Sequence, residues 1–248
     1  MPREAVRVQN LEKRFGRFVA VDKISFSVQE GEIFGFLGPN GAGKSTTIRM
    51  LCGIISPTSG SGHVAGLDIM AQSEGIKQLI GYMSQKFSLY LDMTPFENVR
   101  FYLGIYNVPQ ERWQERLEWV LDIARLGDLK DRPTRDLSPG WRQRLALGCA
   151  LLHEPRILFL DEPTSGVDPI TRRHFWEFIG QLTAGGITVF VTTHYMDEAK
   201  HCNRIVMINE GRIVASGSPE TITSDLFPDR PEADLSDAFI HLMGRRPA

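Results

Sequence analysis

Apolar residues in the N-terminal third of the chain occur in short runs separated by polar turns, a pattern typical of β-strands. Three runs predict strands, AVRVQN at 5–10, ISFSV at 24–28 and EIFGFLG at 32–38. A turn at 29–31 joins the second run to the third, and the third leads directly into a glycine-rich loop. After this loop we expect a helix over 44–52 closed by Gly53, a turn-rich segment at 56–62, and a short strand, LIGYM, around 77–83.

Beyond residue 87 the apolar positions take the spacing of helices. Thr94-Pro95-Phe96-Glu97 is a capping box with proline at the first helical position, and an apolar stripe follows it. Two further helices are predicted over 110–126 and 138–152, where leucine and alanine repeat at helical spacing. The middle of the chain is therefore expected to be a helical insertion.

The last third returns to alternating strands and helices. ILFLD at 157–161 predicts a buried strand, Asp168-Pro169 caps a helix, and ITVFVTT at 187–193 predicts another strand followed by a short helix. RIVMI and RIVAS, joined by a turn at 209–211, form a hairpin pattern. The tail has breaker residues at 228–231 and then the amphipathic stretch LSDAFIHLM, which predicts a packed terminal helix.

These patterns predict an α/β fold with a mixed sheet, an N-terminal antiparallel β part and an inserted α-helical subdomain. We expect a core formed by 1–86 and 154–218, a helical subdomain at 87–153, and a C-terminal helical extension at 219–248.

Composition narrows the class of protein. The 28 Lys and Arg residues are balanced by 30 Asp and Glu, so the basic excess of a nucleic-acid-binding protein is missing and no nucleic-acid partner is expected. No window approaches the roughly 18 apolar residues of a membrane helix, so any work at a membrane is done from outside the bilayer. The cysteines Cys52, Cys149 and Cys202 are odd in number and far apart, which favours reduced thiols in the cytoplasm.

The glycine-rich loop carries the strongest chemical motif. GPNGAGKST at 38–46 matches G-x-x-x-x-G-K-[ST] and lies between an apolar strand and a predicted helix, the context that a P-loop NTPase requires. Its glycines allow backbone N–H groups to wrap a phosphate chain at the start of the helix. We expect Lys44 to reach the β and γ phosphates of ATP and the Ser45 hydroxyl to bind Mg²⁺. The predicted nucleotide-binding residues of this loop are Gly38, Pro39, Asn40, Gly41, Ala42, Gly43, Lys44, Ser45 and Thr46.

A pair of carboxylates follows the buried strand at 157–161. This edge of an open α/β sheet is where ligands bind. We expect Asp161 to hold Mg²⁺ and Glu162 to polarise the water that attacks the γ phosphate. An Asp-Glu pair after an apolar run is common, so by itself it is weak evidence for a catalytic site. It indicates one here because a P-loop precedes it in the chain.

With these motifs in this order, the chain resembles the nucleotide-binding subunits of ABC transporters over nearly all of residues 5–218. The resemblance implies that Gln85 contacts Mg²⁺ or the attacking water, and that His194 senses the γ phosphate. It places Phe15 where the family stacks an aromatic ring on adenine, with Phe18 as a competitor. It also implies that the segment 165–168, which ends at Asp168, crosses a dimer interface and contributes to the nucleotide site.

The segment LSPGW at 137–141 departs from the family pattern LSGGQ. Proline is favoured in the first helical turn, so Ser138 can still cap the helix and Gly140 keeps its amide. We expect Ser138 and Gly140 to bind the γ phosphate held by an opposing subunit. The replacement of an amide side chain by Trp141 either weakens this contact or repositions the helix.

The resemblance implies an ATP-hydrolysing motor subunit that dimerises with a copy or a paired ATPase subunit and drives export through a separate integral membrane permease. THYMDEAKHC at 193–202 and TSGVDPITRR at 164–173 favour the exporter type, on the inner face of the cell membrane. We expect the aromatic-rich stretch 87–106 to contact the permease, although helical packing accounts for more than half of its side chains. Two alternatives remain, a soluble ABC ATPase acting on ribosomes or DNA, and a nucleotide-gated regulator with weak hydrolysis.

Overall fold

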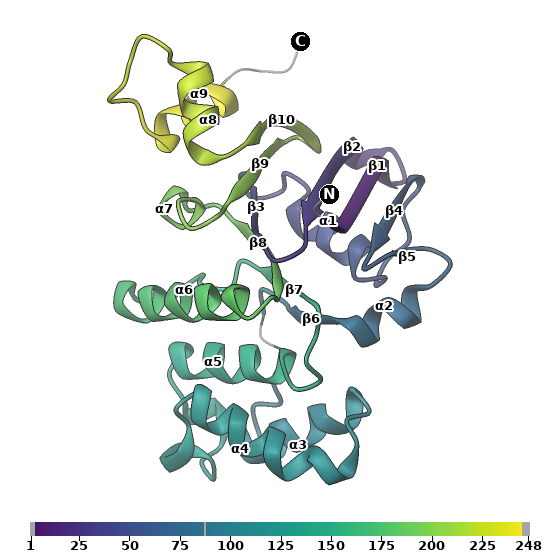
Figure 1. Cartoon of the computed structure of the whole chain (residues 1–248), viewed down its shortest axis with the longest axis vertical. Helices are drawn as coiled ribbons and strands as arrows, with labels where there is room; N and C mark the ends of the chain where they lie inside the picture. Colours follow the sequence, from purple (N-terminus) through teal and green to yellow (C-terminus); the bar gives the residue numbers. More distant parts are fainter. Residues whose placement is uncertain (1–2, 87, 245–248) are drawn as a thin grey trace.

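The computed structural model describes residues 3–86 and 88–244, and a six-stranded sheet forms its centre (Figure 1). The strand order is β10-β9-β3-β8-β7-β6; β10 pairs antiparallel with β9, and the other pairs are parallel. The strands are β3 (Ile33–Leu37), β6 (Ile80–Met83), β7 (Ile157–Asp161), β8 (Thr188–Thr193), β9 (Arg204–Asn209) and β10 (Arg212–Gly217). Every residue of β3, β7 and β8 is buried, as expected for apolar strands covered on both faces. The predicted mixed sheet of an α/β fold is confirmed.

A second, antiparallel sheet lies at the right of the view in Figure 1, with the strand order β2-β1-β4-β5. Its strands are β1 (Glu4–Phe15), β2 (Phe18–Gln29), β4 (Ser59–Val64) and β5 (Leu67–Asp68). The β1–β2 hairpin extends well beyond the predicted runs at 5–10 and 24–28. The turn at 29–31 carries the chain from this sheet into the central one, so the second and third predicted strands belong to different sheets.

Two short segments differ from the sequence prediction. The turn-rich segment 56–62 enters β4 at Ser59, because its backbone pairs with β1 at Val6↔Val64 and Gln9↔Ser61. The strand expected around 77–83 begins only at Ile80, since the residues before it form helix α2 (Ser73–Leu79). In both places the contacts with neighbouring elements override the local pattern.

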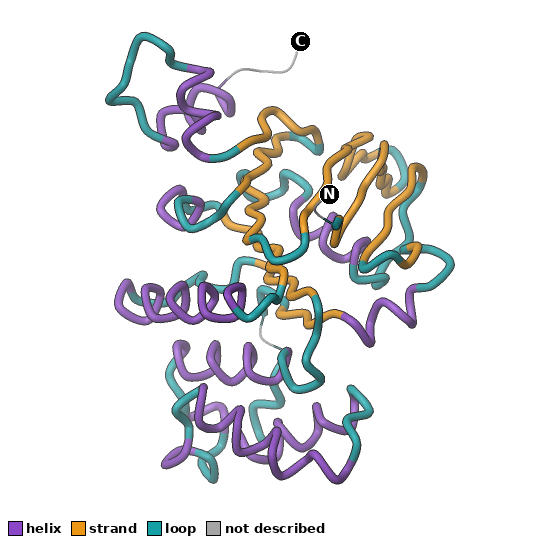
Figure 2. Tube along the Cα trace, in the orientation of Figure 1, coloured by secondary structure: helices purple, strands orange, loops and turns teal. Residues whose placement is uncertain are grey.

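Helices cover both faces of the central sheet, as Figure 2 shows. Helix α1 (Lys44–Leu51) shares one buried cluster with both sheets. The opposite face packs against α5 (Pro139–Ala150), α6 (Pro169–Ala184), α7 (Met196–Ala199), α8 (Pro219–Leu226) and α9 (Leu235–Gly244). Helix α9 lies at the stretch expected to form the terminal helix, and α8 lies at the start of the expected helical extension, where no separate helix was specified. The last residues of that extension, 245–248, lie outside the described residues.

The predicted helical insertion lies below the central sheet in Figures 1 and 2. It contains α3 (Pro95–Ile105), α4 (Trp113–Ile123) and α5, with the short turns η1 (Gln110–Arg112), η2 (Gly127–Leu129) and η3 (Thr134–Asp136). These helices enclose a hydrophobic cluster of their own, which includes Val99, Leu121 and Leu145. The capping box predicted at the start of α3 is present.

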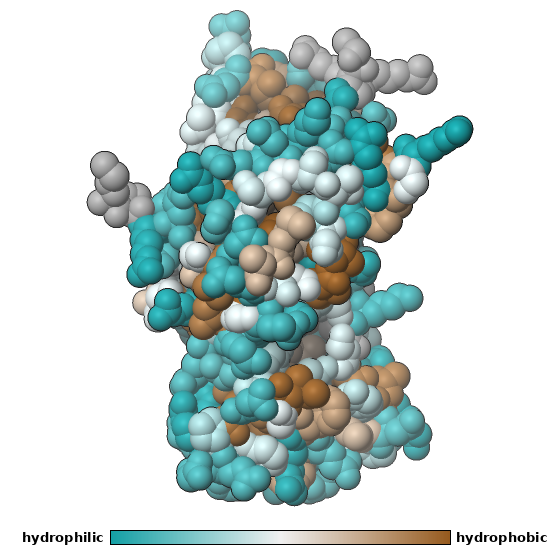
Figure 3. Space-filling model, turned by 90° about the vertical axis from the view of Figure 1, so that its right-hand side faces the viewer, coloured by the Kyte–Doolittle hydropathy of each residue, from teal (hydrophilic) through white to brown (hydrophobic). Residues whose placement is uncertain are grey.

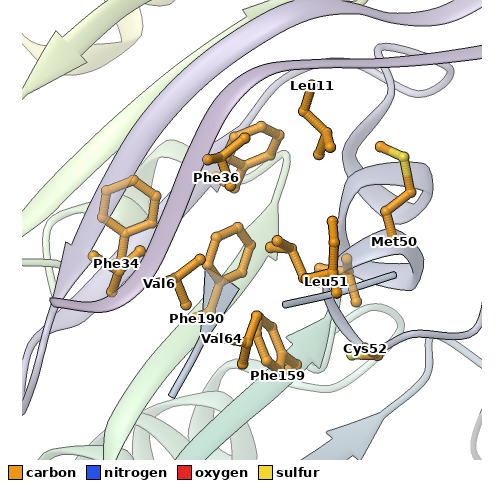
Figure 4. Close-up of a cluster of buried hydrophobic side chains, with 14 of the residues drawn as sticks. Val6, Leu11, Phe34, Phe36, Met50, Leu51, Cys52, Val64, Phe159 and Phe190 are labelled. Atoms are coloured by element: carbon orange, nitrogen blue, oxygen red, sulfur yellow. The ribbon is translucent and has the colours of Figure 1, made fainter. Parts of the chain in front are cut away.

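Buried phenylalanine rings pack together in the core beside the central sheet (Figure 4). The ring of Phe190 lies 5.4 Å from the rings of both Phe34 and Phe159, measured between ring centroids. These residues come from β8, β3 and β7, so their packing holds the three strands in register. The loop 38–46 and the Asp161-Glu162 pair follow β3 and β7 at one edge of this rigid sheet. No helix within residues 3–86 and 88–244 is long and apolar enough to cross a membrane.

Candidate nucleotide-binding site

The glycine-rich loop 38–46 has a backbone that side chains would block. Gly41 and Gly43 have φ angles of +81° and +106°, in the left-handed region that favours glycine. A Cβ atom on Gly43 would lie 2.5 Å from the carbonyl oxygen of Ala20, and one on Gly38 would lie 2.3 Å from that of Ile208. The loop is therefore pressed against β2 and β9. Helix α1 begins directly after it, and no side chain caps the first backbone N–H groups of this helix.

Lys44 is the first residue of α1, and its side chain is folded into the loop. It is 4% exposed, and its Nζ atom donates hydrogen bonds to the carbonyl oxygens of Gly38 at 2.8 Å and Pro39 at 3.1 Å. The same atom lies 3.0 Å from Oε1 of Glu162. The ammonium group is thus held in the middle of the loop, where it can offer its charge to a phosphate.

The other predicted catalytic residues lie around the carboxylate of Glu162. Its φ angle of 48° is unusual for a residue with a side chain, and its backbone N–H donates to the carbonyl and the hydroxyl oxygen of Thr192, at 3.1 and 3.0 Å. The carboxylate is 7% exposed. Nε2 of Gln85 donates to Oε2 at 3.0 Å, and Nδ1 of His194 lies 3.2 Å from the same oxygen without forming a hydrogen bond. Lys44, Gln85 and His194 therefore converge on one buried carboxylate from three distant segments.

Asp161 has hydroxyl partners instead of charged ones. Its Oδ1 atom accepts hydrogen bonds from Ser45 Oγ at 2.9 Å and Thr192 Oγ1 at 2.8 Å. Its negative charge contributes, after burial, to raising the pKa of Tyr82 to about 12. A hydroxyl and a carboxylate oxygen side by side are hard donors that suit Mg²⁺, which keeps several waters and binds few protein groups. Gln85, which was also predicted to bind the metal, donates a hydrogen bond to Glu162.

Thr192 is a site residue that sequence reasoning missed. It is fully buried and touches both acids, donating to Asp161 and accepting from the backbone N–H of Glu162. The available signal was weak, because the two threonines before His194 look like ordinary β-branched strand residues.

The two candidate aromatics for adenine are neighbours at the tip of the β1–β2 hairpin. Phe15 and Phe18 are paired in register and are 53% and 62% exposed. The Lys13 ammonium lies 5.1 Å from the centroid of the Phe15 ring. Ala20, two residues after Phe18, is the residue whose carbonyl approaches Gly43, so the hairpin tip lies near the phosphate loop. The geometry leaves both rings as candidates.

The predicted dimer-contact residues gather in a separate place. Ser138 is the N-cap residue of α5, although its hydroxyl makes no capping bond, and Pro139 stands at the first helical position as predicted. A Cβ atom on Gly140 would lie 2.9 Å from Thr171 Cγ2, so this segment abuts the start of α6. Asp168 caps α6, and hydrogen bonds from the Thr171 hydroxyl and from backbone N–H groups lower its pKa.

Trp141 turns toward the helical part of the chain. Its ring packs against the α3–α5 cluster, and the Arg144 guanidinium lies 5.1 Å from the ring centroid. Among the described residues, no hydrogen bond or ion pair joins Ser138 or Gly140 to the loop 38–46.

Comparison with known proteins shows to which family the chain belongs. A model of the ABC transporter family matches residues 21–165. The chain belongs to the ABC transporter family. It has the fold of ABC ATPase subunits, because it superimposes with a TM-score of 0.86 on the ATP-binding subunit of an ABC transporter, at 27% identity over 96% of this chain and 99% of that one. It also superimposes, with a TM-score of 0.78, on a dimeric ATP-binding cassette in a post-hydrolysis state with ADP and Pi, at 26% identity over 86% and 98%.

Two curated relatives are named as ATP-binding proteins of a multidrug ABC transporter and of Nod factor export. The probable multidrug ABC transporter ATP-binding protein YbhF of Escherichia coli is 46% identical over 96% of this chain, which spans only 41% of that relative's length. The Nod factor export ATP-binding protein I of Ralstonia nicotianae is 39% identical over 88% of this chain and 69% of its own length.

Proposed function

We propose that the chain is the ATP-hydrolysing motor subunit of an exporter-type ABC transporter. The observation that carries this proposal is the convergence of Lys44, Gln85 and His194 on the buried Glu162 carboxylate, beside the Ser45–Asp161 pair. Charge, acid and hydroxyl groups of this kind around one point suit phosphoryl transfer, which depends on positioning and charge stabilisation.

Each residue has a distinct task in the proposed reaction. The N–H groups of the loop 38–46 and the Lys44 ammonium bind the β and γ phosphates of ATP, and Lys44 exchanges its contact with Glu162 for phosphate oxygens. Glu162 then accepts a hydrogen bond from the attacking water and polarises it, while Gln85 orients this water and His194 donates to the γ phosphate as its charge grows. Ser45 and Asp161 would hold Mg²⁺, which neutralises phosphate charge when bound.

We also propose that two subunits complete each site. Ser138 and Gly140 have no bond to the loop 38–46 of their own chain among the described residues, so they are free to contact nucleotide held by a second copy or a paired subunit. Asp168 caps α6 and accepts a hydrogen bond from the N–H of Thr171, the residue that Gly140 abuts, so we assign Asp168 to the same interface. Closure of the dimer on ATP is then the power stroke, and hydrolysis reverses it.

Export requires a membrane partner, and we propose an integral membrane permease that binds the helical part of the chain. Figure 3 shows hydrophobic atoms gathered on the lower part of one face, at the level of α3–α5 in Figure 1. Tyr90, Leu91 and Ile105 are exposed in or next to α3, within the stretch 87–106 predicted to contact the permease; residue 87 itself is outside the described residues. On this proposal the protein works at the inner face of the cell membrane, and 87–153 acts as a subdomain between the core, 1–86 with 154–218, and the permease. The described part of the C-terminal extension, residues 219–244, packs on the core.

Turnover by the purified protein tests the motor function. We expect the wild-type chain to hydrolyse ATP with magnesium, and Glu162→Gln to lower the rate by about 10²–10⁴ while ATP still binds. The Glu162→Gln chain should then dimerise in ATP, as measured by light scattering, and adding Ser138→Ala should weaken that dimer. A wild type without measurable turnover would favour a nucleotide-gated regulator instead. A measurable rate unchanged by Glu162→Gln would contradict the proposed role of Glu162.

A further inference from the structure

A second buried carboxylate, Glu198, lies outside the proposed reaction. It belongs to the short helix α7, four residues after His194, and is 1% exposed. Its Oε2 atom accepts a hydrogen bond from Thr193 Oγ1 at 2.6 Å, and its Oε1 atom accepts one from the Thr164 hydroxyl. Burying a charge of this kind is costly unless it is paired, so the contacts of Glu198 indicate a specific task.

The two threonines belong to the two segments that carry the reacting groups. Thr193 directly precedes His194, and its hydroxyl also accepts from the backbone N–H of Tyr195 at 3.0 Å. Thr164 follows Glu162 by two residues, and its carbonyl accepts from Val167 N–H at 3.2 Å, within the segment 165–168. One carboxylate therefore ties the backbone beside His194 to the backbone between Glu162 and the proposed dimer contact.

Arg172 adds a third connection to the same group. Its Nε atom lies 3.4 Å from Glu198 Oε1, and its guanidinium lies 4.5 Å from the centroid of the Tyr195 ring. Its NH2 group donates to the carbonyl of Val167 at 3.5 Å. Arg172 thus compensates the charge of Glu198. It also contacts Val167, within the segment 165–168, and Tyr195, the residue after His194.

We propose that Glu198 is a positioning residue that transmits the placement of the segment 165–168 to His194. This inference rests on the motor function proposed above. When a second subunit contacts 165–168, Thr164 moves with that segment, and the two oxygens of Glu198 pass the displacement to Thr193 and the backbone of His194. His194, which lies 3.2 Å from Glu162 without a hydrogen bond in the single chain, is then turned toward the γ phosphate in the closed dimer. Among the residues that the structure describes, no hydrogen bond or ion pair joins Glu198 to the loop 38–46, so we expect nucleotide binding itself not to depend on it.

The test removes the two hydroxyls separately and together. Thr164→Val and Thr193→Val keep the side-chain shape and delete one hydrogen bond to Glu198 each, whereas Thr164→Ser and Thr193→Ser keep the hydroxyl. Thr183→Val is the matched control, because the Thr183 hydroxyl bonds only the Ile179 carbonyl within α6, at 2.9 Å. For each variant the ATP turnover rate, the Kd for ATP and the Tm are measured on the full chain.

We expect each valine variant to lower kcat at least tenfold with an ATP Kd within twofold of wild type, and each serine variant to restore most of the rate. The double valine variant should lose less than the product of the two single losses, because both changes act through Glu198. The inference is overturned if kcat is unchanged, if the losses multiply, if serine does not rescue, or if kcat falls only in parallel with Tm. The wild-type rate and Glu162→Gln separate these outcomes from failure of the motor function, since a wild type without turnover refutes that function first.

Discussion

At the scale of single residues, Asp161 and Glu162 are adjacent carboxylates with different partners, because the backbone directs their side chains differently. Asp161 ends β7 and takes hydroxyl partners from Ser45 and Thr192. Glu162 follows in the left-handed conformation, which directs its carboxylate to Lys44, Gln85 and His194. Lys44 and Ser45 were expected as site residues from the P-loop motif, and Gln85 and His194 from the family resemblance. Thr192 was not expected. A threonine at the end of an apolar strand carries no motif, because its role arises only when β7 and β8 pair.

Thr192 provides a direct test at this scale. Thr192→Val removes the hydroxyl that bonds Asp161 Oδ1, so the carboxylate proposed to hold Mg²⁺ loses its orientation. We expect the magnesium concentration for half-maximal ATP turnover to rise about tenfold, as is usual when a partner of a metal ligand is lost. Thr192→Ser, which keeps the hydroxyl, should stay near wild type. An unchanged magnesium dependence in Thr192→Val would contradict the assignment of Asp161.

At the scale of elements, the sequence predicted best where local pattern and tertiary contacts agree. The start of α3 was predicted because the capping box of Thr94 and Glu97 lies within four residues. Strand β4 was missed, because Ser-Gly-Ser-Gly has little strand propensity and depends on pairing with β1. Helix α2 was missed for a similar reason, since only Ile76 of its residues is buried and the apolar signal of a helix is weak there.

The connection between α5 and β6 predicts a pH dependence of stability. His153 follows α5, its Nε2 atom is 2.9 Å from the carbonyl of Ile80, and its ring stacks 3.9 Å from that of Tyr106. Burial, with a smaller effect of the Arg116 charge, lowers the pKa of His153 below its usual 6.5. In the unfolded chain His153 therefore becomes protonated at about pH 6.5, whereas in the folded chain it stays neutral to a lower pH. The free energy of unfolding falls as the pH drops below about 6.5.

Urea unfolding at pH 7.5 and 5.5 measures this effect. We expect the free energy of unfolding of the wild type to be lower at pH 5.5. In His153→Gln the decrease should be smaller, by up to about 1.4 kcal/mol for each pH unit between the two pKa values. The comparison uses the change with pH within each protein, so the lost ring stacking cancels. Equal pH dependence in both proteins would show that His153 does not titrate on unfolding.

At the scale of the whole molecule, helix α1, which follows the phosphate loop, lies beside the two sheets, whereas α3 lies at the lower end of the view in Figure 1, below α5. Gln85 links the nucleotide site to the helical insertion, because it bonds Glu162 and lies just before that insertion. Sequence patterns predicted this arrangement in outline, since the family resemblance covers nearly all of 5–218. The packing of α8 was not predictable, because its buried Ile222 finds partners only on the folded core.

Recovery with a membrane partner tests the docking proposal. We expect the chain to co-purify from detergent-solubilised membranes with an integral membrane protein. Leu91→Glu and Ile105→Glu, which place charge on exposed apolar positions, should reduce that recovery without lowering ATP turnover of the isolated chain. Ile240→Glu on α9, where the side chain is 70% exposed, is the control and should have no effect. Recovery of the chain from the soluble fraction alone would contradict a permease partner.

The most direct measurement of the central claim is equilibrium binding of ATP with magnesium to the purified chain and to Lys44→Met. Lys44 places its charge at the centre of the loop 38–46, so we expect the wild type to bind ATP and the variant to bind about 10- to 100-fold more weakly. A wild type that fails to bind ATP, or a Lys44→Met variant that binds it equally well, would contradict the claim that this loop holds the nucleotide.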